Sequence, residues 1–357
     1  MKAPNDNYFY IPQIKRRNQK AAIFKYLTVL AIVFSISFLV FFLVDIVRAG
    51  YPAFTQTYIK IEVSINDEVV ENPYGAVNGK QLKIISRAWL RDLPLLIKAN
   101  PSWMNTKQEF WALANSEVDQ YLKGKESRTS ERDRAYVDEL KNDGKVELKF
   151  NTLFLLSGDS KIPENSGIYS AIIGSLLTMI VTIAIAFPIG VMTAIYLEEF
   201  APENKLTHII EVNINNLAAI PSILFGLLGL AIFINFFGVP RSSPLVGGMT
   251  LALMSLPVII VSSKAALKSV PASIRQAGFG LGLTKWQIVR DHVLPVAMPG
   301  ILTGSIISIA RAIGETAPLI IVGMIAFVPD AATSFSDAAT VLPAQIFTWA
   351  GMPEKAY

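Results

Sequence analysis

The feature of this sequence that most limits its fold is the recurrence of apolar runs about as long as a bilayer is thick. The first covers residues 21–47, and others follow at about 168–197, 209–237, 245–261 and 300–328. A helix needs about 20 mostly apolar residues to cross the hydrocarbon core. Hydrophobic residues make up 52% of the chain and charged ones 17%, which is too apolar for an ordinary soluble protein. We therefore predict an all-α polytopic membrane protein with five visible spans.

The positions of Lys and Arg predict the orientation of these spans. Residues 1–20 are basic, so the N-terminus is expected in the cytosol of a cell whose inner (cytoplasmic) membrane holds the protein. Alternation then puts residues 263–298 in the cytosol, and this segment contains five basic residues and one acidic residue, Asp291. A signal peptide is the alternative for 21–47, but that run is too long and no small-residue cleavage site follows it. A formal charge of only +4 implies no nucleic-acid partner.

Residues 48–165 have the composition of a soluble domain. Charges of both signs are interspersed, and no run is long or apolar enough to span. Its carboxylates are expected to form a solvated face, and no catalytic constellation is visible among them. We predict a small α+β extracytoplasmic domain inserted between the first and second spans. Its expected elements are a strand at 58–65, helices at 81–99, 107–122 and 130–140, and an extended segment at 146–155.

The last run carries a charged pair, Arg311 and Glu315. An arginine at bilayer depth costs roughly 2.5–3.5 kcal/mol on insertion scales, so it should face protein or a water-filled path. Residues i and i+4 lie on one helix face, where the guanidinium can offer its planar fork to an oxyanion. The alternative is an ion pair that only fixes helix packing. Ser222 and Thr316 can donate hydroxyl hydrogen bonds either to a substrate or to their own helices.

Prolines predict where the runs break. Residues 188–190 (Pro-Ile-Gly) are expected to interrupt the second run, and Pro221 to kink the third. Leu294-Pro295 is expected to end a short helix before the next begins at about Pro299. Broken helices are common around transport sites.

Motifs of bond-making chemistry are missing. The sequence holds no GxxxxGK[ST], HExxH or GxSxG motif, and the run at 278–282 with three glycines follows no strand. Zero cysteines exclude disulfides and thiolate sites. We expect no enzyme, no catalytic or metal site and no cofactor in this chain. A membrane-anchored sensor that reads a ligand with residues 48–165 is another hypothesis, but no cytosolic segment is long enough for a signalling module.

Four motifs that follow one another resemble a known family. They are GVMTAIYLEEFAP at 190–202, NLAAIPSILFG at 216–226, the loop through Leu294-Pro295, and RAIGETAPL at 311–319. Together they resemble the PstA-type permease of the phosphate ABC importer, over about 166–349. The resemblance implies the type I ABC importer permease fold for residues 166–357, with a further span expected after them.

The resemblance also implies a function and partners. The chain would translocate inorganic phosphate, while two PstB-like ATPase subunits bind the ATP and Mg. A PstC-like second permease would complete the pore, and a PstS-like extracytoplasmic binding protein would deliver phosphate. Sulfate, molybdate or phosphonate remain alternative substrates, because only the GETAPL likeness selects phosphate.

In permeases of this kind a cytosolic loop docks into the ATPase. Its pattern is Glu-Ala-Ala, three residues, Gly, nine residues, an apolar residue, one more and Leu-Pro. Gln276, Gly278 and His292 depart from it here, and the glycines suit close backbone approach or a tight turn. The alternative is an amphipathic surface helix at the inner leaflet, which leaves the glycine spacing unexplained. The implied coupling residues are Gln276, Ala277, Gly278, Gly282, Trp286, Leu294 and Pro295.

Overall fold

The computed structural model describes residues 12–354, and the chain divides into two compact units, residues 1–56 and 57–357. The first unit is built on α1 (Pro12–Gly50), which contains the predicted span 21–47 and is followed by a short helical turn at Tyr51–Phe54. The side chains of α1 from residue 16 onward are exposed within this unit, as expected where lipid is the solvent. Thr28 and Ser35 donate their hydroxyls to carbonyls of the preceding turn at 2.9 Å. Residues 1–11 of the predicted basic segment 1–20 lie outside the described part.

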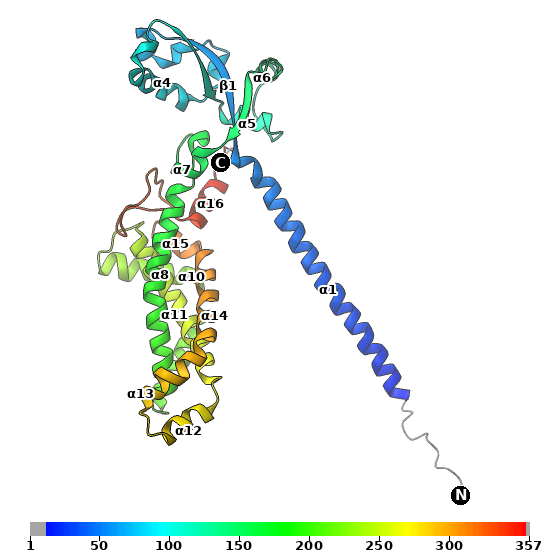
Figure 1. The fold of residues 1–357 in the computed structure, drawn as a ribbon, viewed down its shortest axis with the longest axis vertical. Helices are drawn as coiled ribbons and strands as arrows, with labels where there is room; N and C mark the ends of the chain where they lie inside the picture. Colours follow the sequence, from blue (N-terminus) through cyan, green and yellow to red (C-terminus); the bar gives the residue numbers. More distant parts are fainter. Residues whose placement is uncertain (1–11, 355–357) are drawn as a thin grey trace. The chain divides into compact units, whose positions relative to one another are not determined.

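The second unit begins with a three-stranded sheet in the order β2-β1-β3 (Figure 1). β1 (Thr55–Ser64) pairs antiparallel with β2 (Lys107–Leu113), and β3 (Val146–Phe150) lies on its other side. Burial alternates along β1, so Ile59, Ile61 and Val63 enter the core while Lys60 and Glu62 do not. Period-two patterning therefore predicted this strand correctly.

Helices supply the rest of that core. α4 (Arg87–Ala99) presents Leu90, Leu93 and Ile97 at helical spacing, and all three are buried in the cluster that contains Ile59. The shorter helices are α2 (Asp67–Glu71), α3 (Gln81–Ile84), α5 (Ser116–Leu122), α6 (Glu131–Asn142) and α7 (Thr152–Leu156).

The structure corrects three sequence-based elements here. The predicted helix 107–122 is wrong in its first half, because residues 107–113 join the ladder of β1 and Asn115 then caps α5 by accepting from the Val118 N–H at 2.9 Å. The predicted helix 81–99 is divided where Ser86 caps α4. The extended segment 146–155 ends where Asn151 caps α7. In each case a side-chain cap starts a helix that apolar spacing alone did not delimit.

Long apolar helices form the remainder of the unit. Four helices in the described residues, α1 included, are long and apolar enough to cross a membrane, or up to five if one bent pair counts as a span. α11 lies between α8 and α14 and packs against both (Figure 1). The elements are α8 (Tyr169–Ile195), α9 (Lys205–Ala218), α10 (Ser222–Gly229), α11 (Pro244–Lys268), α12 (Ala272–Gly280), α13 (Lys285–Ile288), α14 (Leu294–Ile313), α15 (Ala317–Ile321) and α16 (Leu342–Ala350).

The proline predictions have different outcomes. At Pro221 the chain turns, since helical segments 205–218 and 222–236 are bent by 105°. Pro188 does not interrupt α8, and helix continues from Lys285 to Ile313 through Pro295, so the predicted end at Leu294-Pro295 is wrong. A π-helical turn at Val289–Val293 directly precedes Pro295. Such a turn accommodates the proline ring while the helix continues.

Ile59→Ala tests the core of the sheet. Ile59 is fully buried, so we expect the free energy of opening of β1 to fall by about 2–5 kcal/mol. Hydrogen exchange of β1 amides in the full-length protein measures this. Lys107→Gln is the control, because it breaks only the exposed ion pair with Glu62 and should leave the protection of β1 nearly unchanged. Equal losses in both variants would contradict the packing described.

Candidate functional site

The predicted pair Arg311 and Glu315 is formed at a helix end. Arg311 lies in the last turn of α14, Gly314 ends that helix, and Glu315 lies in the break before α15. The Nε of Arg311 donates to Oε1 of Glu315 at 3.3 Å. The Arg311 side chain is 58% exposed and that of Glu315 18%. The guanidinium therefore remains accessible to a further partner while Glu315 holds one edge of it.

Arg311 also lies beside the bend between α9 and α10. A small cleft there is lined by Arg311, by Ala218 and Ile220 of the bend, and by Ser255 and Ser308. The Ser255 hydroxyl is buried and has no hydrogen-bond partner among the described residues. Sequence reasoning missed both serines, because a serine within an apolar helix resembles any other small packing residue.

The remaining predicted path residues, Ser222 and Thr316, lie next to this place without joining the pair. Ser222 is the first residue of α10 and Thr316 precedes α15, and both are partly buried. Neither hydrogen-bonds to Arg311 or Glu315 within residues 12–354. The helices they begin do touch: a Cβ at Gly226 would lie 2.7 Å from Cα of Pro318, so α10 and α15 pack in close contact. Two motifs distant in sequence thus meet at one point of the fold.

The predicted coupling segment is a helix, a turn and a second helix. Gly278 of α12 is buried against Ile288, since an added Cβ would lie 2.6 Å from its Cγ1. Gly282 has φ +76°, a left-handed conformation that favours glycine. Thr284 and Gln287 then form a reciprocal cap for α13. The two glycines therefore serve the close approach and the tight turn that their spacing predicted.

The outer surface of this segment is exposed and partly apolar. Phe279 and Leu281 are 56% and 79% exposed. Trp286 is 56% exposed and has its ring centroid 6.2 Å from that of Phe200. Gln276 and Ala277 are also exposed, whereas Leu294 and Pro295 lie in the continuous helix that follows.

An ion pair that sequence reasoning missed ties this segment to the end of α8. Arg275 donates from Nε to both carboxylate oxygens of Glu199 at 3.2 Å and from Nη2 to Oε1 at 2.5 Å. The Glu199 side chain is only 5% exposed. The hydrogen bond to Glu199 raises the pKa of Arg275 above its ordinary value. The signal in the sequence was an acidic pair, Glu198-Glu199, at the end of an apolar run and opposite a basic loop.

A second charged group lies nearby at the same end of the helices. Lys264 of α11 donates to Glu211 of α9 and lies 3.9 Å from Glu198. A cavity of about 260 Å³ adjoins these side chains. Its lining combines Lys264 and Glu211 with apolar residues such as Ile260.

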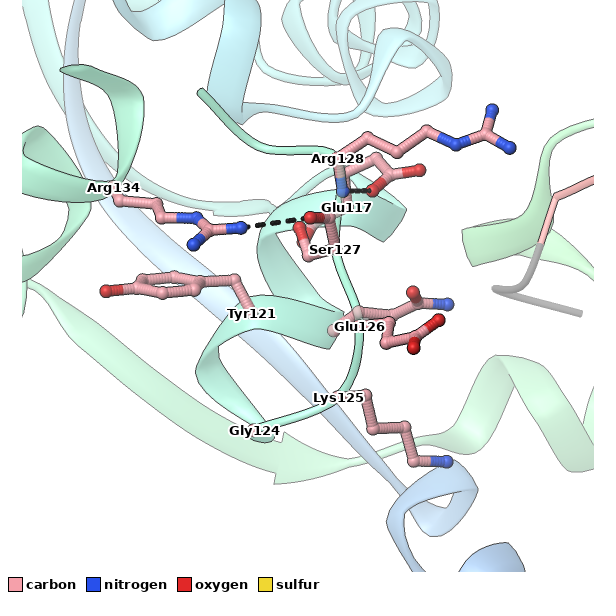
Figure 2. A pocket seen from close by; sticks show the side chains of 9 residues that line it. Glu117, Tyr121, Gly124, Lys125, Glu126, Ser127, Arg128 and Arg134 are labelled. Carbon is pink, nitrogen blue, oxygen red and sulfur yellow. Dashed lines mark hydrogen bonds between the residues drawn. The ribbon is translucent and has the colours of Figure 1, made fainter. Parts of the chain in front are cut away.

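The part of the second unit that contains the sheet also has a hollow, of about 760 Å³ (Figure 2). Its polar groups mostly hold its own loop: Arg134 Nη2 donates to the Ser127 carbonyl at 3.0 Å, and the Arg128 N–H to Glu117 at 2.5 Å. The Arg134 guanidinium also lies 5.1 Å from the centroid of the Tyr121 ring. Within the described residues, no cluster of His, Asp and Glu has the arrangement of a metal site.

Two parts of the chain match models of protein families. Residues 186–352 match the family model described as binding-protein-dependent transport system inner membrane component. Residues 12–83 and 75–132 match a domain of unknown function, DUF3333.

Three relatives are named as permeases. The chain is 36% identical over 162 residues to the phosphate transport system permease protein PstA 1 of Mycobacterium tuberculosis, covering 45% of this chain and 53% of that protein. It is 37% identical to PstA of Mycobacterium leprae, with the same coverage. It is 33% identical over 168 residues to the probable ABC transporter permease YqgI of Bacillus subtilis, covering 47% and 56%. The chain thus spans about half the length of these relatives.

A solved structure of the MetNI methionine ABC transporter, in an inward-facing conformation, is also similar. The identity is 22% and the TM-score 0.37, over 41% of this chain and 70% of that one.

Residues 186–352 thus resemble the inner membrane component family, and the chain is similar to permeases of the ABC transporter class. The similarity to PstA proteins confirms the resemblance found in the sequence. The relatives are transporter components, which supports the prediction that this chain is not an enzyme.

Gly278→Val tests the packing of the coupling segment. The added methyls collide with Ile288, so we expect a loss of about 1–3 kcal/mol in the local stability of α12. Hydrogen exchange over residues 272–293 measures it. Adding Ile288→Ala should restore part of the loss, as side chains in contact are coupled. Gly280→Val, with nothing within 4 Å of its Cβ, should be milder, and an equal effect there would contradict the predicted contact.

Proposed function

We propose that this chain is the permease subunit of an ABC importer that moves inorganic phosphate across the cytoplasmic membrane, while separate ATPase subunits hydrolyse ATP. The observation that carries the proposal is the accessible guanidinium of Arg311 beside a broken helix, in the segment that matches PstA proteins. Phosphate crossing a low-dielectric region needs a compensating charge, and the guanidinium fork suits an oxyanion.

The helix break supports this path. Irregular backbone at membrane depth is tolerated where it is buried in protein or lines a water-filled cavity. The bend between α9 and α10 and the break between α14 and α15 both lie next to Arg311. Ser255 adds a buried hydroxyl without a partner among the described residues, in the lining of the same cleft. Ser222 and Thr316 are proposed to contribute from the starts of their helices.

The orientation is proposed from charge and from the order of elements. The basic residues in the first turns of α1 favour a cytosolic N-terminus, and the basic segment 263–298 is proposed on the same side. α7 adjoins the start of α8 through a hydrogen bond from Ile168 N–H to the Phe154 carbonyl, whereas Glu199 near its end meets Arg275. The sheet and its helices are therefore proposed as the extracytoplasmic insertion in a type I permease fold.

The coupling segment gives the proposed partners. Exposed apolar side chains on α12 and on the turn after it suit an ATPase cleft, and two such subunits with ATP and Mg would power the cycle. A second permease is proposed to complete the pore, because the Arg311 side chain is exposed when this chain is taken by itself. An extracytoplasmic phosphate-binding protein would deliver the substrate.

Arg311→Gln tests the substrate path. We expect ATP-driven phosphate uptake into vesicles to fall about 30-fold or more, equal to about 2 kcal/mol, because glutamine stays polar but loses the charge and the guanidinium fork. Arg91→Gln, an exposed arginine in α4, is the matched control. Normal uptake by assembled Arg311→Gln complex would rule out the oxyanion role.

Gly282→Val tests the coupling turn. A branched residue at φ +76° is strained by more than about 1–2 kcal/mol, so the turn should open and the ATPase should no longer copurify in a pull-down. Gly144→Val places the same strain at φ +70° in the part with the sheet, and there association should persist. Unchanged association in Gly282→Val would argue against docking at this turn.

A further inference from the structure

The side chain of Arg275 joins three elements at one end of the helix bundle. Besides its three hydrogen bonds to Glu199, Nη1 donates to the Val270 carbonyl at 2.8 Å and Nη2 to the Leu267 carbonyl at 3.0 Å. Leu267 lies in the last turn of α11, where its carbonyl also accepts from the Val270 N–H at 3.2 Å, and Val270 follows the end of that helix. The guanidinium thus satisfies the last turn of α11 and the carboxylate beyond α8 at once.

Arg275 supplies the polar anchor of the segment around it. α12 is short, spanning nine residues from Ala272 to Gly280, and of these only Gly278 is buried. Its apolar anchors are the Gly278 contact with Ile288 of the following helix, and Ile274, which packs against the cluster that contains Leu197 and Leu267. Arg275 is the polar connection from α12 to both of those helices in the described part of the chain.

We propose that the Arg275–Glu199 pair is the positioning element that transmits movement of the coupling segment to α8 and α11. This rests on the proposed function, because it assumes that an ATPase moves α12. A displacement of α12 pulls on the guanidinium, and the guanidinium is bonded in two directions to the ends of the long helices. Arg275 and Glu199 touch neither substrate nor ATP in this role.

The chemistry explains why these residue types occupy the two positions. A planar guanidinium can bind a carboxylate with one edge and backbone carbonyls with its remaining N–H groups. A lysine offers a point charge with rotatable donors and fixes no such plane. Glu199 is nearly buried, so its charge requires this partner throughout the cycle.

The absence of cysteine from the sequence allows a clean test. Leu281→Cys and Met192→Cys, at exposed positions beyond α12 and on α8, accept spin labels in the full-length protein in nanodiscs. Electron–electron resonance then reports the distribution of distances between the labels. Three variants are compared in that background: Arg275→Gln, Glu199→Gln and the double variant Arg275→Gln/Glu199→Gln. Lys107→Gln, which breaks an exposed ion pair elsewhere, is the control.

We expect a broader distance distribution in all three variants and an unchanged one in Lys107→Gln. In the reconstituted complex the ATPase should still copurify, whereas phosphate moved per ATP hydrolysed should fall about tenfold. The double variant leaves no unpaired buried charge, so it should fold even where a single variant does not. Arg275→Lys should recover part of the coupling, which loss of a merely structural contact would not predict.

A wild-type distance distribution and a wild-type coupling ratio in the double variant would overturn the proposal. The distance measurement needs neither ATPase nor anion. If the unmodified complex moved no phosphate, the proposed function would fail, while a broadened distribution would still show that the pair positions α12.

Discussion

A bilayer offers no water to backbone N–H and C=O groups, so a chain that crosses it must pair them internally. The rest of this structure depends on that constraint. Hydroxyls in the apolar helices bond to carbonyls, as Thr178 does to Gly174 at 2.7 Å and Thr250 to Val246 at 2.7 Å. Helix also continues through Pro188 within the apolar run of α8.

The same constraint limits where a helix can be broken. Backbone is irregular between α9 and α10 and again between α14 and α15, and these two places meet near Arg311 and Glu315. Broken helices near charge are what a transport path requires. Beyond the C-terminal end of α8, Arg275 donates to the carbonyls of Leu267 and Val270 and to the buried carboxylate of Glu199. A guanidinium suited to an anion thus lies beside the middle of α11, whereas the C-terminal ends of α8 and α11 are linked through Arg275.

Sequence patterns predicted the features that depend on local length and periodicity. The apolar runs at 21–47, 168–197 and 245–261 became unbroken helices, whereas those at 209–237 and 300–328 are broken. β1 formed where residues alternate, and the i, i+4 spacing brought Arg311 to Glu315. Gly278 and Gly282 took the roles that glycine chemistry suggests. Features that depend on tertiary contact were not predictable. Residues 107–113 form a strand because β1 is beside them, and the partner of Arg275 lies 76 residues away. The helix end predicted at Leu294-Pro295 is wrong, because a π-helical turn before Pro295 allows the helix to continue.

The central claim is that the path near Arg311 carries phosphate. The most direct test reconstitutes the permease with its ATPases, second permease and binding protein, and measures ATP hydrolysis as single anions are added outside. Phosphate should stimulate hydrolysis, while sulfate, molybdate and phosphonate should leave it near the basal rate. Stimulation by one of those anions with no response to phosphate would contradict the account.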